Sequence, residues 1–208
     1  MAADSAGDTD DELQALASHL DFVLVPGFKD SGPEHWQSIW QRRTPLFRRV
    51  TQRHWNEPDI EHWVDAITRL LGSSGRPVVL VGHSLGALAS ACVAGDRHPR
   101  VAGLMLVAPA EPARFEAEGR VPERRLDVPT LVVASEDDRV MSIRRAKHWA
   151  SVWGADLVDL GEAGHINAEA GFGPWPHGLH LLAKLARQIV TALPGVADGI
   201  TARCDPSR

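Results

Sequence analysis

One serine stands between two glycines where an apolar run gives way to a run of small residues, in VVLVGHSLGALAS at 78–90. A serine hydroxyl is a weak nucleophile unless a base lies beside it, and a sharp strand-to-helix turn projects such a side chain above a sheet. Gly82 and Gly86 have no side chain at the two positions where the strand and the helix approach most closely. The G-x-S-x-G pattern predicts Ser84 as a catalytic nucleophile; an inert serine in a glycine-rich turn is the alternative.

A general base is expected later in the chain, where five histidines follow Ser84. His165 lies in GEAGHIN, directly after the strand-like run 156–160. Ligands of an open parallel sheet bind beyond the carboxyl ends of its strands, so an imidazole there can reach Ser84. We predict His165 as the base, with His177 as the next candidate.

A carboxylate is needed on the far nitrogen of that base, to fix its tautomer and stabilise the imidazolium. The segment SEDDRVMS follows the strand-like run 130–134 and offers Glu136, Asp137 and Asp138. We favour Asp138, because Val140 can pack inward and fix the loop. Asp137 and Glu111 remain alternatives.

Two backbone N–H groups are expected to hold the oxyanion of a tetrahedral intermediate. One is that of Leu85, at the start of the helix after Ser84. The other is that of Phe28, in VPGFKDSG after the first strand-like run, where Gly27 allows a tight turn. A plain Pro-Gly turn is the alternative for this second group.

Three further predictions concern the substrate site, the cysteine at position 92 and metal binding. His35 and Trp175 are predicted to line the substrate site, although packing of His35 against the first helix is an equal alternative. Cys92 is expected to be a small core residue. We predict no metal site, because His35, His54 and His62 include no i, i+4 pair on one helix, and because His177 and His180 lack an evident third ligand.

Short apolar runs alternate with helix-like segments, which predicts an α/β fold with a doubly wound, mostly parallel sheet of about six strands. The expected strands are 22–25, 78–81, 104–108, 130–134, 156–160 and, more weakly, 48–55. The expected helices are 33–42, 59–71, 85–94, 142–153 and 178–193. The stretch between 108 and 130 is too short for a helical lid domain.

Composition narrows the class of protein. The chain has 208 residues, a net charge of −5 and two cysteines. The sequence lacks the basic stripe of a nucleic-acid-binding protein and lacks an apolar run of about 18 residues that could span a membrane. Its few cysteines favour a reducing compartment, so we expect the protein in the cytoplasm. Residues 1–19 read as a disordered acidic leader, 20–195 as the folded domain and 196–208 as a tail.

Four stretches together resemble one family: FVLVPGFKDSGPEHWQSIWQ, VVLVGHSLGALAS, LVVASEDDRVMS and LGEAGHINAEAGFGPWPHG. They are similar to the small, lidless α/β-hydrolases related to retinoblastoma-binding protein 9. The resemblance implies a Ser–Asp–His triad at Ser84, Asp138 and His165, with no cofactor and no metal. The chain has no L-x-C-x-E segment, so the protein binding suggested by that member's name is not expected here.

The function predicted from the sequence is that of a carboxylesterase-like serine hydrolase. It would cleave a small ester, thioester or activated amide through an acyl-enzyme on Ser84. Two alternatives stay open: a non-catalytic protein-binding module on the same fold, and an acyltransferase that uses an acceptor other than water. No oligomeric state is predicted.

Overall fold

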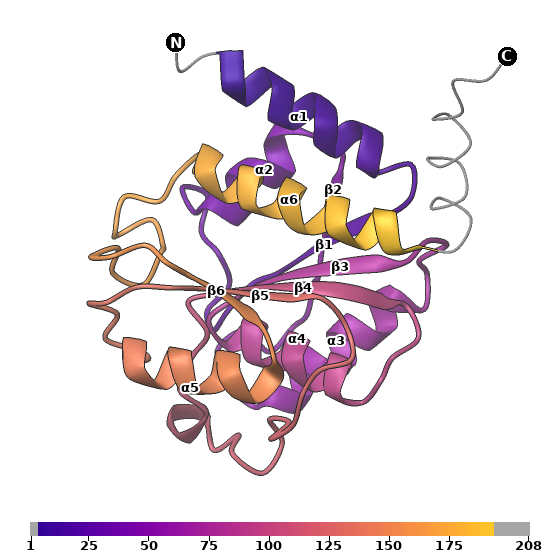
Figure 1. The fold of residues 1–208 in the computed structure, drawn as a ribbon. Coiled ribbons are helices and arrows are strands. Elements are labelled where there is room, and N and C mark those ends of the chain that lie inside the picture. The colour runs from indigo at the N-terminus through magenta and orange to yellow at the C-terminus, as the bar shows by residue number, and fades with distance from the viewer. Residues whose placement is uncertain (1–3, 194–208) are drawn as a thin grey trace, which may run out of the picture.

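Six parallel strands form a single sheet in the computed structural model, which describes residues 4–193 (Figure 1). Their order across the sheet is β2-β1-β3-β4-β5-β6. The strands are β1 (Asp21–Val25), β2 (Phe47–Arg49), β3 (Val78–His83), β4 (Val101–Val107), β5 (Thr130–Ala134) and β6 (Asp156–Asp159). The helices are α1 (Asp4–Leu16), α2 (Trp36–Arg43), α3 (Ile60–Leu71), α4 (Leu85–Gly95), α5 (Ile143–Trp153), α6 (Pro176–Ala192) and the 3₁₀ turn η1 (Pro112–Phe115).

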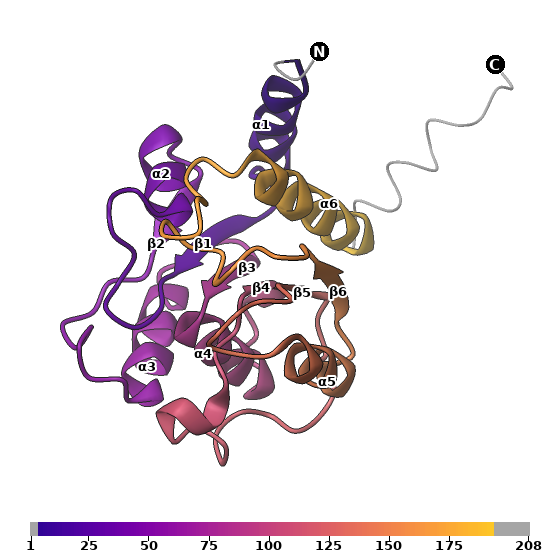
Figure 2. The same cartoon turned by 90° about the vertical axis from the view of Figure 1, so that its left-hand side faces the viewer.

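The strands are apolar throughout because helices cover both faces of the sheet. In β1, Val23 and Val25 join the core under α3, α4 and α5, whereas Phe22 and Leu24 join the core under α1, α2 and α6. Figures 1 and 2 show these two helical layers on opposite sides of the strands. The doubly wound α/β fold predicted from the sequence is therefore confirmed.

The structure shortens one predicted strand and agrees with the prediction for the link between β4 and β5. The weak candidate strand 48–55 is real only at its start, since β2 covers Phe47–Arg49 and the chain then leaves the sheet edge. The link between β4 and β5 holds only loops and the four-residue η1. The absence of a lid domain, within the described residues, is as predicted.

The expectation of a disordered leader over residues 1–19 is wrong for most of that segment. Helix α1 lies against α6 (Figure 1), with the Leu13 side chain 1% exposed. Two of its acidic residues are paired: Asp10 accepts from Arg43 at 2.8 Å, and Glu12 accepts from Nε of Arg187 at 2.7 Å. The helix thus covers part of the core that lies between the sheet and helices α1, α2 and α6. The predicted tail at 196–208 lies outside the described residues.

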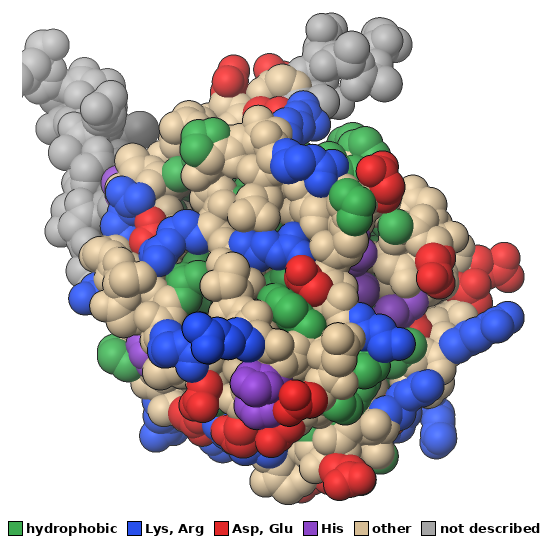
Figure 3. Space-filling model, turned by 180° about the vertical axis from the view of Figure 1, so that it is seen from behind, with side chains coloured by type: hydrophobic (Ala, Val, Ile, Leu, Met, Phe, Trp, Pro, Cys, Tyr) green, Lys and Arg blue, Asp and Glu red, His purple; other side chains and the backbone are tan. Residues whose placement is uncertain are grey.

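The surface seen from behind mixes acidic, basic and hydrophobic side chains (Figure 3), in keeping with 22 Lys and Arg against 27 Asp and Glu. Over the described range, no helix has both the length and the apolar character needed to cross a bilayer.

Candidate active site

Ser84 occupies the turn between β3 and α4 in a backbone conformation that most residues avoid. Its φ is 55° and its ψ is −121°, which costs on the order of 1–3 kcal/mol. The Ser84 N–H donates to the carbonyl of Val107 at 3.1 Å, so the neighbouring strand holds this turn in place. Such strain is typical of a residue whose side chain must be presented to a ligand.

The two glycines around Ser84 are required by contact with backbone atoms. A Cβ at Gly82 would lie 2.6 Å from the Cα of Ala87, and one at Gly86 would lie 2.3 Å from the carbonyl oxygen of Val25. Neither backbone atom can move without shifting a strand or a helix. The tight turn of the G-x-S-x-G pattern is therefore present in the structure.

Ser84, His165 and Asp138 form one hydrogen-bonded chain, although each comes from a different loop. The Oγ of Ser84 lies 2.9 Å from Nε2 of His165, and Nδ1 of His165 lies 2.9 and 3.1 Å from the two carboxylate oxygens of Asp138. An ionised carboxylate can only accept, so Nδ1 carries the proton and Nε2 is free to accept from the serine hydroxyl.

The other acidic candidates have different partners. Asp137 accepts from the Ser135 hydroxyl and from the Gly164 N–H, both at 2.7 Å, and these contacts lower its pKa. Glu111 forms a two-point ion pair with Arg145 at 2.8 and 3.0 Å.

Asp138, by contrast, has a side chain that is 3% exposed and accepts from the N–H of Val140 at 2.7 Å. Val140 is partly buried against the core, as the sequence suggested. Among the predicted bases, His177 lies exposed on the first turn of α6, away from this chain of hydrogen bonds.

The N–H groups of Phe28 and Leu85 are available to a ligand. Among the described residues, neither donates to a protein acceptor. Leu85 begins α4, and Gly27 brings the Phe28 loop against the serine, since a Cβ at Gly27 would lie 2.9 Å from Cβ of Ser84. Two free donors beside a nucleophile are what an oxyanion hole requires.

We expect Gly27→Ala to lower kcat/KM by about 100-fold, since a displacement of about 1 Å costs this much in well-aligned active sites. Its methyl group would lie 2.9 Å from Cβ of Ser84, closer than such atoms can approach, and would push the nucleophile aside. Gly32→Ala is the matched control in the same loop, because a Cβ there meets nothing within 4 Å. Equal ester turnover by the two variants would contradict this account of the loop.

A buried glutamine, which no sequence motif indicated, anchors the Phe28 loop to the sheet. The Gln37 side-chain amide donates to the carbonyls of Val25 and Val81 at 3.2 and 3.0 Å and accepts from the Ser31 hydroxyl at 2.7 Å. Arg49 donates to the Ser31 carbonyl at 2.9 Å and pairs with Asp30. The loop is thereby fixed at both ends before any ligand arrives.

Three aromatic donors fix the loop that carries His165. His83 donates from Nε2 to the His165 carbonyl at 2.9 Å, and Trp36 donates from Nε1 to the Ile166 carbonyl at 3.0 Å. Trp40 donates from Nε1 to the Pro174 carbonyl at 2.8 Å. Each ring combines a large buried surface with a single polar contact, which explains part of the chain's seven tryptophans.

The predicted substrate contacts of His35 and Trp175 are not supported by their positions. His35 is 6% exposed and caps α2, where its Nδ1 accepts from the Gln37 N–H at 3.2 Å. Trp175 is 7% exposed and packs against Trp36 and Trp40. Both side chains point into the core, where they pack against the aromatic cluster under the His165 loop.

Burial keeps two of these histidines neutral. Desolvation, followed by the charges of Arg49 and His165, lowers the pKa of His35 to about 4. Desolvation, followed by His35 and His165, lowers the pKa of His83 well below 6.5. Burial also raises the pKa of the Cys92 thiol to about 12, so this cysteine does not compete with Ser84 as a nucleophile.

We predict that stability falls as pH drops from 6.5 towards 4, because the unfolded chain then binds a proton that folded His35 rejects. The loss reaches about 3 kcal/mol at the lower end. His35→Asn keeps a capping acceptor but cannot titrate, so its stability should depend less on pH. Urea unfolding at neutral pH and at about pH 5 measures the free energy of unfolding of both proteins. Identical pH dependence in the two would remove His35 as the cause.

Comparison with known proteins agrees with this architecture. The model of the serine hydrolase family matches residues 22–184, and the chain belongs to that family. The resemblance stated from the four sequence stretches is thereby confirmed at the level of a small serine hydrolase family. No curated protein matches the chain.

Solved structures give the same result. A protein described as a YdeN-like hydrolase from Pectobacterium atrosepticum is 50% identical, with a TM-score of 0.86 over 88% of this chain and 98% of that one. The ydeN gene product of B. subtilis is 21% identical, with a TM-score of 0.66 over 80% and 98%. Est1E from Butyrivibrio proteoclasticus, solved with ferulic acid, is 12% identical, with a TM-score of 0.59 over 82% and 87%. The last two share the fold.

Proposed function

We propose that this serine hydrolase cleaves a small ester, thioester or activated amide through an acyl-enzyme on Ser84. Nε2 of His165 takes the hydroxyl proton as Oγ attacks the carbonyl carbon, and the N–H groups of Phe28 and Leu85 hold the oxyanion. His165 then protonates the leaving group. A water molecule, deprotonated by His165, releases the acid and regenerates Ser84.

The observation that carries this proposal is the 2.9 Å separation of Ser84 Oγ and His165 Nε2, with Asp138 behind the imidazole. The same serine holds a strained backbone conformation beside two free N–H donors. This combination does not favour a protein-binding module, because backbone strain at Ser84 and an aligned Ser–His–Asp chain contribute nothing to a docking surface.

The short connection between β4 and β5 favours small acyl groups. Only loops and η1 separate β4 from β5, and the Phe28 ring meets the η1 residue Phe115 edge-on with centroids 6.1 Å apart. A long acyl chain would find little apolar wall beyond that contact. We expect acetyl and butyryl esters to be hydrolysed faster than palmitoyl esters; the opposite order would overturn this substrate class.

A fluorophosphonate probe tests the nucleophile directly. We expect covalent labelling of the wild type and of Ser151→Ala, whose serine is exposed on α5, but no labelling of Ser84→Ala. Equal labelling of Ser84→Ala and wild type would refute the assignment. Product analysis with added alcohol or amine then separates hydrolysis from acyl transfer, since both pass through the same acyl-enzyme.

A further inference from the structure

Three side chains with metal-binding atoms meet on the turn between β2 and α3, outside the Ser84 site. His54, Glu57 and His62 each offer a ligand atom, and these atoms lie within 4.8 Å of one another. His54 and Glu57 belong to the turn, whereas His62 lies in the first turn of α3. No metal site is predicted from the sequence, because no helix carries two histidines four residues apart. In the structure, one histidine comes from the turn and the other from the helix.

The contacts within this cluster leave it able to rearrange. Nδ1 of His54 lies 3.2 Å from Oε1 of Glu57, and the His54 ring stacks on the His62 ring with centroids 4.4 Å apart. The side chains of His54 and Glu57 are 49% and 66% exposed. Side chains this exposed can rotate towards a common centre with His62, although His54 then gives up part of its stacking on that ring.

A second observation points to a ligand beside the two histidines of this cluster. Nδ1 of His62 is buried and has no hydrogen-bond partner within residues 4–193. Both polar atoms of the Gln52 side-chain amide are buried without a partner over the same range. Gln52, His54 and His62 line one hollow of about 550 Å³. Buried polar groups normally have a hydrogen-bond partner, so these atoms are expected to contact a ligand that is not part of the protein.

Two imidazoles and one carboxylate select the kind of ion. This donor set suits Zn²⁺, which binds histidine nitrogen and carboxylate oxygen at about 2.0–2.2 Å, whereas Ca²⁺ and Mg²⁺ prefer all-oxygen sites. Ligand atoms no more than 4.8 Å apart would each move by less than about 1 Å to reach such bond lengths. Three protein ligands leave a fourth position for water.

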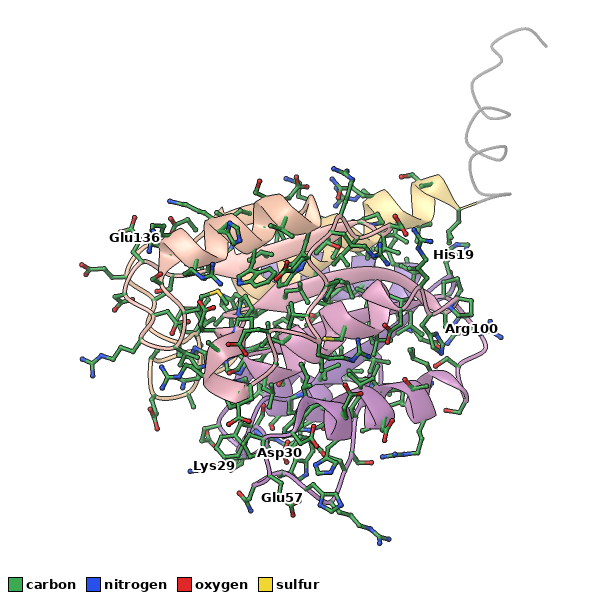
Figure 4. The ribbon with its side chains drawn as sticks, turned by 90° about the horizontal axis from the view of Figure 1, so that it is seen from below. His19, Lys29, Asp30, Glu57, Arg100 and Glu136 are labelled. Carbon is green, nitrogen blue, oxygen red and sulfur yellow. The ribbon has the colours of Figure 1, made fainter. Side chains whose placement is uncertain are left out.

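We propose that His54, Glu57 and His62 bind one Zn²⁺ ion. The ion ties the turn at 51–59 to the start of α3. Trp55 in that turn accepts from the Lys29 N–H at 2.9 Å and packs edge-on against Trp63 at 5.7 Å. Figure 4 shows Glu57, Lys29 and Asp30 at the same end of the molecule. Bound zinc therefore stiffens the support of the Phe28 loop.

Titration of the chelator-stripped full chain with ZnCl₂ by calorimetry tests the site. We expect one ion per chain. Both Glu57→Gln and His62→Gln should weaken binding by more than about 100-fold, beyond what loss of an outer partner costs. His19→Gln, an exposed histidine elsewhere, is the matched control and should bind as the wild type does. Wild-type affinity in Glu57→Gln and His62→Gln would overturn the proposal.

His165→Gln separates this site from the Ser84 site, whose histidine is also a potential ligand. Zinc binding should persist in His165→Gln, and its loss there would place the ion at Ser84 instead and refute the proposal. Hydrogen exchange gives a readout independent of activity. Zinc should slow exchange at 51–59 and at the Lys29 amide in the wild type but not in Glu57→Gln, whose exposed side chain can be replaced without unfolding. Equal protection in both proteins would contradict the assignment.

Discussion

Replacement of Ser84 by alanine is expected to lower kcat for ester hydrolysis by about 10⁶-fold, as loss of the nucleophile does in other serine hydrolases. No other hydroxyl lies within hydrogen-bond distance of His165 Nε2 among the described residues. The free N–H groups of Phe28 and Leu85 should still bind a polarised carbonyl, so turnover should remain about 10³–10⁴-fold above the reaction in water.

Initial rates with an activated acetyl ester measure this effect, and Ser151→Ala serves as the control because its hydroxyl lies on α5. Circular dichroism should be unchanged in both variants. Retention of more than about a tenth of the wild-type kcat by Ser84→Ala would show that the chemistry does not pass through this oxygen.

Asp138→Asn is expected to lower kcat by about 10⁴-fold. The amide occupies the space of the carboxylate but donates where the carboxylate accepts. His165 would then turn its unprotonated Nδ1 towards residue 138 and its proton towards Ser84, so Nε2 could not accept the serine proton. The Val140 N–H still finds an acceptor in the asparagine oxygen, which should preserve the loop.

Asp137→Asn is the neighbouring control. An asparagine oxygen can still accept from the Ser135 hydroxyl and the Gly164 N–H, so we expect less than about a tenfold loss. Glu111→Gln should likewise be mild, since Glu111 serves Arg145. A loss below about tenfold in Asp138→Asn, together with a large loss in either control, would move the acid to that residue.

Local patterns were sufficient to predict the sheet and the loops that meet at its carboxyl edge. The runs 78–81 and 130–134 read as strands because both faces of each strand are buried. Parallel strands bring their carboxyl ends to one edge, so the loops holding Ser84, Asp138 and His165 had to converge.

Features that depend on distant partners could not be predicted. The segment that forms α1 is acidic, and its partners Arg43 and Arg187 lie far along the chain. His35 and Trp175 carry side chains typical of ligand sites, yet only the packing around Trp36 decides that they are buried.

Direct observation of the covalent intermediate would test the central claim of this account. After rapid mixing with an activated acetyl ester and acid quenching, intact-mass spectrometry should find the protein heavier by one acetyl group. Peptide analysis should place that group on Ser84, and Ser84→Ala should remain unmodified under the same conditions. An acetyl group found at another residue, or turnover by the wild type with no acyl-enzyme under conditions where release is slowed, would contradict the mechanism.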